Sequence, residues 1–130
     1  MTPILCLDPG MAHTGIAISH EGILAEPLTT IFERNPQVLI GRLTPLIARL
    51  NPHTIVIGSP SHGPLVKTAQ DISDRLSAIF QGKIEIYNED LSSRKAKTHM
   101  RETNKKINSR SNLEHQTAAA FILQDYLDSL

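Results

Sequence analysis

The sequence predicts an α/β fold in which a mixed five-stranded sheet is flanked by helices. Three short β-type segments come first and are separated by turns, which is the pattern of an antiparallel meander. Two further β-type segments then alternate with segments of helical periodicity, which is the pattern of parallel strand–helix–strand crossovers. The length of 130 residues is close to the commonest domain size, so we expect residues 1–130 to form a single domain.

The strands are expected at residues 4–7, 14–19, 23–31, 54–57 and 84–87. The first is an apolar run that stops at Asp8-Pro9-Gly10, and the second alternates Ile16 and Ile18 with smaller residues. The fourth and fifth are runs rich in β-branched residues that end at polar or turn-forming residues.

Three helices are expected among and after the later strands. The first begins at Asn35-Pro36, because Asn caps free amides and Pro lacks one, and Pro45 is expected to kink or shorten it. The second runs from Pro64 to a stop at Gly82. The third opens with residues 111–114, Ser-Asn-Leu-Glu, the pattern of a capping box. Its apolar positions are Ala118, Ala119, Ile122, Leu123 and Tyr126.

Composition excludes several classes of protein. No window approaches the roughly 18 apolar residues needed to cross a bilayer, and the chain does not open with a signal-peptide pattern. Cys6 is the only cysteine, so an intramolecular disulfide is excluded. It lies in an apolar strand without an adjacent histidine, and we interpret it as an inert core thiol. These features lead us to expect a cytoplasmic protein.

The net charge of zero conceals a basic segment. Of the 13 basic residues, seven lie between residues 94 and 110, where Glu102 is the only acid. Such a segment either contacts phosphates or is a solvated surface, and residues 104–112 are polar enough to predict a mobile loop. Three Phe and two Tyr are too few to indicate base stacking as the binding mode. The residues expected to hold a nucleic-acid backbone are Arg94, Lys95, Lys105, Lys106 and Arg110.

Two carboxylates lie just beyond predicted strands. Asp8 follows the first strand and Glu89 follows the fifth. In open α/β sheets, sites gather at the carboxyl ends of strands, so the two side chains could share one site. A divalent cation that prefers oxygen ligands, Mg²⁺ or Mn²⁺, would offset their repulsion. Taken alone, a turn aspartate more often caps the chain locally. We interpret Gly10 and Gly15 as residues that permit a tight turn nearby.

Several motifs, in order along nearly the whole chain, resemble the YqgF/RuvX family. The motifs are Leu7-Asp8-Pro9-Gly10, Gly15-Ile16-Ala17-Ile18-Ser19, Pro27-Leu28-Thr29-Thr30-Ile31, Ile55-Val56-Ile57-Gly58-Ser59-Pro60, Glu89 with Leu91-Ser92-Ser93, and Ile122-Leu123-Gln124. The resemblance implies an RNase H-like fold related to the RuvC resolvases. It also implies a nuclease, because family members are described as processing the 5′ end of pre-16S ribosomal RNA or as resolving Holliday junctions.

The resemblance implies three catalytic acids, of which Asp8 and Glu89 match the first two. The third, on the final helix, falls on His115. Glu114 is expected to serve the capping box and to lie roughly 100° away around the helix, so we expect His115 to be the third site residue. A neutral imidazole would favour Mn²⁺ over Mg²⁺, or would act as general acid or base beside one ion. The alternative is a packed or surface histidine in a degenerate site.

Four further positions depart from the family pattern. His13 stands where the family has a basic residue and His20 where it has an acid, while Asn88 and Asp90 replace the residues that flank the family glutamate. These changes bear on substrate contacts more than on the fold. We interpret His13 and His20 as surface polar residues.

The function expected first is a metal-dependent endonuclease acting on structured RNA in 5′-end processing of pre-16S ribosomal RNA. In that function Asp8, Glu89 and His115 are both catalytic residues and metal ligands. The first alternative is a Holliday junction resolvase acting on branched DNA as a dimer, because two symmetric strands must be cut together. The alternative from another class is a catalytically impaired nucleic-acid-binding module. Both a monomer and a homodimer remain open at this point.

Overall fold

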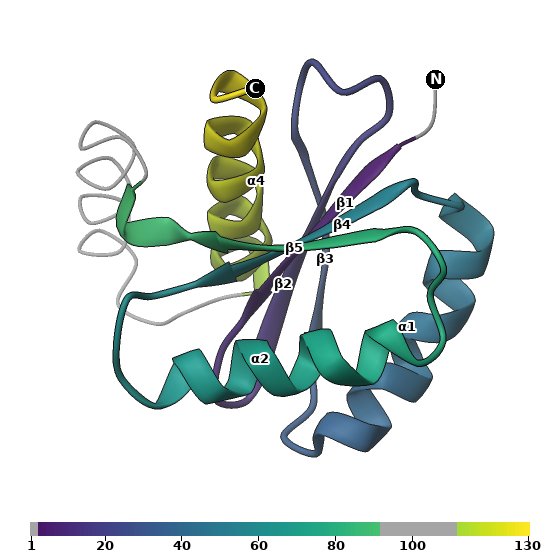
Figure 1. Cartoon of the computed structure of the whole chain (residues 1–130), viewed down its shortest axis with the longest axis vertical. Helices are drawn as coiled ribbons and strands as arrows, with labels where there is room; N and C mark the ends of the chain where they lie inside the picture. The colour runs from purple at the N-terminus through teal and green to yellow at the C-terminus, as the bar shows by residue number, and fades with distance from the viewer. Residues whose placement is uncertain (1–2, 92–111) are drawn as a thin grey trace.

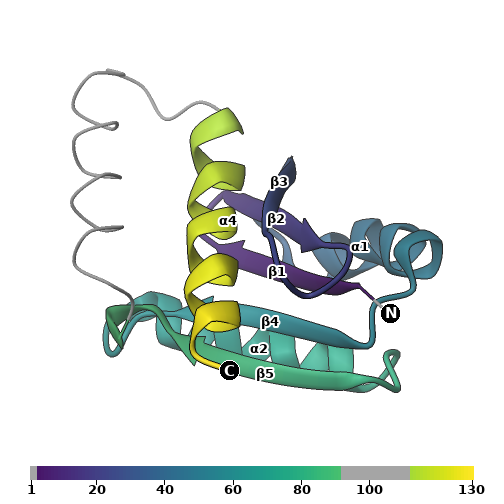
Figure 2. The same ribbon diagram turned by 90° about the horizontal axis from the view of Figure 1, so that it is seen from above.

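One mixed five-stranded sheet organises the chain, as seen in a computed structural model that describes residues 3–91 and 112–130. The strands are β1 (Ile4–Pro9), β2 (His13–Ser19), β3 (Glu26–Phe32), β4 (Thr54–Ser59) and β5 (Lys83–Asn88). The helices are α1 (Pro36–Leu50), α2 (Pro64–Ser77), the short 3₁₀ helix η1 (Glu89–Leu91) and α4 (Asn112–Asp128). Figure 1 labels the five strands and the helices α1, α2 and α4. The strand order across the sheet is β3-β2-β1-β4-β5 (Figure 2).

The pairing of the strands follows the predicted topology. β1 pairs antiparallel with β2, and β2 pairs antiparallel with β3. β1 and β4 are parallel, as are β4 and β5. The predicted meander followed by two crossovers is therefore confirmed.

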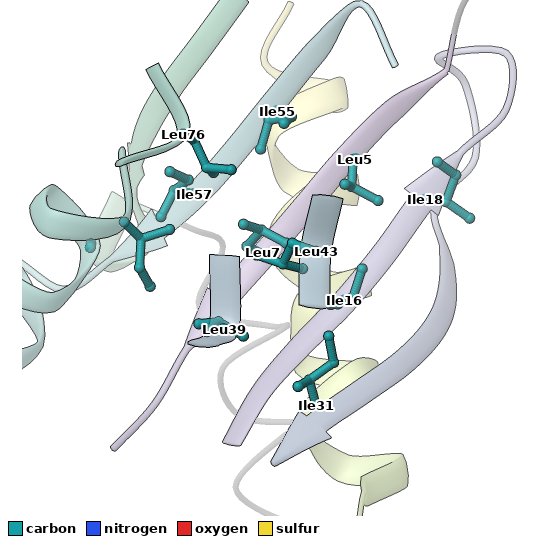
Figure 3. Packing of buried hydrophobic residues seen from close by; sticks show 12 residues of the cluster. Leu5, Leu7, Ile16, Ile18, Ile31, Leu39, Leu43, Ile55, Ile57 and Leu76 are labelled. Carbon is teal, nitrogen blue, oxygen red and sulfur yellow. The ribbon is translucent and has the colours of Figure 1, made fainter. Parts of the chain in front are cut away.

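The helices cover the sheet on both faces. Figure 2 shows α4 lying across one face, with α1 and α2 on the other. Successive strand residues point to opposite faces, so Leu5 and Leu7 of β1 face α1 and α2 while Ile4 and Cys6 face α4. Figure 3 shows the first of these cores, in which strand side chains meet Leu39, Leu43 and Leu76 of the two helices.

The core beneath α4 combines smaller side chains with two polar pairs. Ala119, Ile122 and Leu123 pack on Cys6 and Val56. Beyond this apolar contact, α4 is bonded to the edge strand β5. The Tyr87 hydroxyl donates to Asp125 Oδ2 (2.6 Å), the Tyr126 hydroxyl donates to Glu85, and the two rings meet edge to face at 5.7 Å.

These pairs shift the pKa values of their members. Burial, and then the neighbouring carboxylate, raises the pKa of Tyr126 to about 12, and Tyr87 is raised to about 12 in the same way. The hydroxyl that Tyr126 donates lowers the pKa of Glu85. Both tyrosines therefore stay protonated donors at neutral pH and hold α4 against β5.

Several predicted features of the helices and strands differ from the structure. Of the two outcomes expected at Pro45, a kink or a shortened helix, the shortening does not occur: α1 runs to Leu50, and Pro45 lies on its exposed side, where water can solvate the carbonyl that its missing N–H would have bonded. α2 ends at Ser77, before Gly82, because the amides of Ala78 and Ile79 bond only three residues back, to the carbonyls of Arg75 (3.3 Å) and Leu76 (3.0 Å). β3 begins at Glu26 rather than at residue 23, because its ladder with β2 ends at the pair Ile18 and Glu26.

Some predictions fall on parts of the chain that the structure does not describe. Ser111 of the predicted capping box and residues 104–111 of the predicted loop are among them. The predicted apolar face of the last helix is confirmed, since Ala118, Ala119, Ile122, Leu123 and Tyr126 are all buried. Within residues 3–91 and 112–130, no helix has the length and apolar character to cross a membrane.

Candidate active site

Asp8 lies within β1, which is longer than the sequence predicts. It pairs with Gly15 in the antiparallel ladder, while the parallel ladder to β4 stops one residue earlier at Leu7 and Ile57. The alternation of the strand directs Asp8 to the same face as Cys6, toward α4. Its half-buried carboxylate thus lies on the α4 face, at the carboxyl end of the central strand.

Glu89 follows β5 immediately and begins η1. Its carboxylate turns in over the neighbouring strand, because Glu89 Oε2 lies 3.4 Å from the position that a Cβ on Gly58 would occupy. The Cδ1 atom of Ile122 in α4 lies 3.0 Å from that same position. The missing side chain of Gly58 therefore gives both Glu89 and α4 room above β4.

The charges of Asp8 and Glu89 both act on the thiol of Cys6. Burial raises the pKa of Cys6 well above its usual range, and the negative charges of Asp8 and Glu89 raise it further. Both carboxylates therefore contribute to the electrostatic environment of one buried thiol. The expectation that the two acids gather at one end of the sheet agrees with this geometry, and Cys6 is the buried core thiol that the sequence predicts.

The residues on either side of Glu89 fasten it to the loop after β4. The Ser61 amide donates to Asp90 Oδ2 (2.7 Å), and Asn88 Nδ2 donates to the Ser61 hydroxyl (3.0 Å). The Asp90 amide in turn donates to Asn88 Oδ1 (2.9 Å). Asn88 and Asp90, two of the departures from the family pattern, thus form a frame with Ser61 that fixes the backbone on both sides of Glu89.

His115 lies in the first turn of α4, and its backbone packs on Gly15 of β2. A Cβ on Gly15 would overlap the carbonyl group of His115 and come within 3.0 Å of the amide nitrogen of Gln116. Gly15 is thus required for the close approach of α4, and its interpretation as a turn residue was wrong because it lies inside a strand. Since Gly15 is the ladder partner of Asp8, the His115 backbone lies one strand away from Asp8.

The His115 ring stacks on the ring of His13. Their centroids are 4.6 Å apart and their planes differ by 3°. His13 also meets the edge of the Phe32 ring at 4.9 Å, so this half-buried histidine packs against two rings. His20, in contrast, is exposed and lies 3.7 Å from the Glu26 carboxylate, as expected of a surface residue. His13 and His115 lie far apart in sequence, and only the packing of α4 on Gly15 brings them together.

The donors fit a divalent cation in part. Asp8 and Glu89 offer the carboxylate oxygens that Mg²⁺ and Mn²⁺ prefer. In the described part of the chain, no three or more His, Cys, Asp or Glu side chains are arranged to hold a metal ion. The imidazole of His115 is stacked on His13 in this conformation. Arg94, Lys95, Lys105, Lys106 and Arg110, the predicted backbone contacts, lie outside the described residues.

Comparison with known proteins shows the family of the chain. Residues 2–129 match the sequence profile of the family described as "RuvX: Holliday junction resolvase". The chain belongs to the RuvX family. A relative from Chloroflexus aggregans, named "Putative pre-16S rRNA nuclease", is 36% identical over 132 residues, which cover 97% of this RuvX chain and 93% of the relative. A relative of the same name from Chloroflexus aurantiacus is 33% identical and covers 97% of this chain and 86% of its own length.

A solved structure of low sequence identity resembles the RuvX chain in fold. It is RuvC of T. thermophilus in complex with a Holliday junction substrate, with a TM-score of 0.59 and 11% identity over 99% of this chain and 95% of RuvC. The predicted RNase H-like fold is confirmed. With the family description and the names of the relatives, the predicted enzyme class, a nuclease, is confirmed as well.

Proposed function

We propose that this RuvX chain is a divalent-metal-dependent endonuclease that hydrolyses phosphodiester bonds in structured RNA, at the 5′ end of pre-16S ribosomal RNA. The observation that carries the proposal is the place of Asp8 and Glu89 beside the carboxyl end of β4: Glu89 Oε2 lies over Gly58 of β4, and Asp8 lies in the neighbouring strand β1 on the α4 face of the sheet. The names of the relatives support RNA as the substrate.

Asp8 and Glu89 are the proposed metal ligands and catalytic residues. Each contributes carboxylate oxygens from a different strand end, so the two negative charges favour a cation between them. A bound divalent ion would supply an activated water and would stabilise the leaving oxygen of the phosphodiester. The frame of Ser61, Asn88 and Asp90 holds Glu89 in position for this task.

His115 is the proposed third site residue. Its backbone packs on the ladder partner of Asp8, which supports a place beside the acids. A neutral imidazole brings a nitrogen donor without negative charge, so the site would lean toward Mn²⁺. Binding of the ion through His115 would weaken as the imidazole protonates.

The basic residues between positions 94 and 110 are proposed to hold the substrate backbone. Seven basic residues against one acid give this stretch a charge of +6. Arg94, Lys95, Lys105, Lys106 and Arg110 are the proposed contacts. Each contact with a phosphate releases a counterion, so replacing Lys105 or Lys106 by Ala would lower the slope of log affinity against log salt by about 1.

The deciding experiment is a cleavage assay on a pre-16S-like RNA and on a four-way DNA junction, each with Mg²⁺ or Mn²⁺. We expect RNA cleavage by the parent and none by Asp8→Asn or Glu89→Gln, because each substitution removes one negative charge at the ion. Glu21→Gln, the same change at an exposed turn, serves as control and keeps full activity. Equal cleavage by Asp8→Asn and the parent would refute the proposal.

The role of His115 has its own measurement, titration calorimetry with Mn²⁺ and Mg²⁺. His115→Ala is expected to bind Mn²⁺ more weakly than the parent, while His115→Asp is expected to shift the preference toward Mg²⁺. His20→Ala, at an exposed site, is the control. If the alanine variant binds Mn²⁺ as tightly as the parent, His115 is not a ligand.

Two other functions are tied to particular observations. The family description favours a junction-resolving deoxyribonuclease that acts as a dimer, and cleavage of the four-way DNA junction alone would support it. The histidine at position 115 favours a nucleic-acid-binding module without activity, and binding without cleavage under every condition would support that function.

A further inference from the structure

Three rings gather beside the proposed site, on the part of the sheet that α4 reaches first. His115 of α4 stacks on His13 of β2, and Phe32 of β3 meets His13 edge to face. Phe32 is 57% exposed, although it is one of only three phenylalanines in the chain. We call Phe32, His13 and His115 the aromatic shelf, since the rings come from three elements and end in an exposed phenyl group.

Two hydrogen bonds hold the backbone at and beside Phe32. The Arg42 guanidinium of α1 donates to the Phe32 carbonyl (2.8 Å), and the Glu33 amide donates to the Ala12 carbonyl (2.8 Å). His13 packs on one side of the Phe32 ring. An exposed apolar ring held in one place costs little ordering entropy when a flat ligand stacks on it, so the shelf is preorganised for stacking.

The charge beside the shelf indicates the chemistry of the ligand. The guanidinium carbon of Arg34 lies 5.9 Å from the centroid of the Phe32 ring, so a cation accompanies the exposed aromatic surface. A ligand that combines a flat π-face with a negative group matches both features, and a nucleotide is such a ligand.

The shelf is also well placed for a strand that passes the two acids. Phe32 pairs with His13, which is two residues along β2 from Gly15, and Gly15 pairs with Asp8. Two strand spacings and two residues along the strand separate Phe32 from Asp8, which is roughly 12 Å between Cα atoms. A base stacked on Phe32 would therefore belong to a nucleotide near the bond to be cut.

From these contacts we propose that the aromatic shelf stacks an unpaired base of the substrate strand and so favours single-stranded positions over continuous duplex. The proposal rests on the proposed function, since it presupposes a nucleic-acid substrate. Paired bases in a duplex present edges rather than faces, so duplex binding does not use the shelf. Phe32 is on this account a residue that determines specificity rather than a catalytic one.

The test is binding of a single-stranded oligoribonucleotide with one 2-aminopurine, measured by fluorescence in EDTA so that no metal chemistry contributes. Phe32→Ala is expected to weaken this binding roughly 5- to 100-fold and to abolish the quenching of the base, because base–aromatic stacking has that strength. Phe32→Trp keeps a ring and is expected to bind within about twofold of the parent. Affinity for a blunt RNA duplex stays the same in all variants.

Val38→Ala is the matched control, because Val38 is an exposed apolar side chain on α1, 46% exposed and away from the shelf. Urea unfolding of each variant shows that it is folded. If the parent binds and cleaves RNA and Phe32→Ala binds the single strand as tightly as the parent, the stacking role of the shelf is overturned. The proposed function is then left intact. A parent that binds neither RNA nor DNA overturns both. An equal loss of duplex and single-strand binding in Phe32→Ala also overturns the stacking role.

Discussion

Replacing Gly15 by Ala tests the packing that builds the site. A Cβ at this position would overlap the carbonyl of His115 and lie 3.0 Å from the amide nitrogen of Gln116. All of these atoms are backbone atoms of α4, so no side-chain rotation can relieve the overlap. The first turn of α4 must retreat on the order of an ångström, while the polar pairs with β5 hold the other end of the helix in place.

The expected cost is at the upper end of that for overpacked cores, about 3 kcal/mol of unfolding free energy. With a denaturant slope of about 1.5 kcal/mol/M for a small protein, the urea midpoint falls by about 2 M. Gly41→Ala is the matched control, because Gly41 lies in an exposed turn of α1 where a Cβ meets nothing within 4 Å. Alanine there is expected to stabilise the helix by about 0.5–1 kcal/mol.

The two substitutions add the same methyl group, and we expect them to change the free energy of unfolding in opposite directions. Equilibrium unfolding in urea, followed by far-UV circular dichroism, measures both. A Gly15→Ala variant within about 0.5 kcal/mol of the parent would mean that α4 does not approach β2 as closely as described. The placement of His115 next to Asp8 would then fail with it.

Further predictions concern α4, the thiol and the Glu89 frame. The pKa of Tyr126 in the folded protein is about 12, above its ordinary 10. Its contribution to the free energy of unfolding is therefore full below pH 10 and is lost as the pH rises toward 12. Tyr126→Phe should lose less melting temperature than the parent over that interval. The pKa of Glu85 is lowered, so its contribution to the free energy of unfolding is lost as the pH falls below its ordinary pKa of 4.5. Tyr126→Phe should therefore also lose less melting temperature than the parent on acidification. Iodoacetamide at pH 8 should label Cys6 only after unfolding, and labelling of the native protein at the rate of a free thiol would contradict its burial. Asp90→Ala removes the acceptor of the Ser61 amide and should slow RNA cleavage while changing the unfolding free energy by about 1 kcal/mol; an unchanged rate would show that the frame does not position the acid.

Local patterns predicted most of the sheet because they report directly on burial. Ile16 and Ile18 alternate with smaller residues, and both strand residues are buried toward α1 and α2. The tolerance of Pro45 was not predictable from its own neighbourhood, because it depends on which side of α1 faces water. The early end of α2 was not predictable either, because it depends on the amides of Ala78 and Ile79, which bond three rather than four residues back.

In the candidate site, too, some features follow from local sequence patterns and others do not. The gathering of Asp8 and Glu89 follows from a rule about strand ends, which a linear sequence can express. The orientation of His115 toward the sheet follows from helical periodicity, since the buried Ala119 and Ile122 lie on the same side of the helix. The contact of its ring with His13 follows from neither, because it requires the distance between α4 and β2 that Gly15 sets.

The stack of His13 on His115 connects two departures from the family pattern that lie far apart in the sequence. The resemblance places a basic residue at position 13 and an acid at position 115, and here those positions are in direct contact through parallel rings. A cation and an anion so placed would pair, so exchanging both for neutral imidazoles removes one positive and one negative charge. Under the proposed function, the net charge around Asp8 and Glu89 would then be unchanged, and the affinity for a cation would fall less than the loss of one acid alone implies. The two histidines would in that case act as one coupled replacement, in which a stacked contact takes the place of an ion pair and Asp8 and Glu89 keep the charge that a bound ion requires.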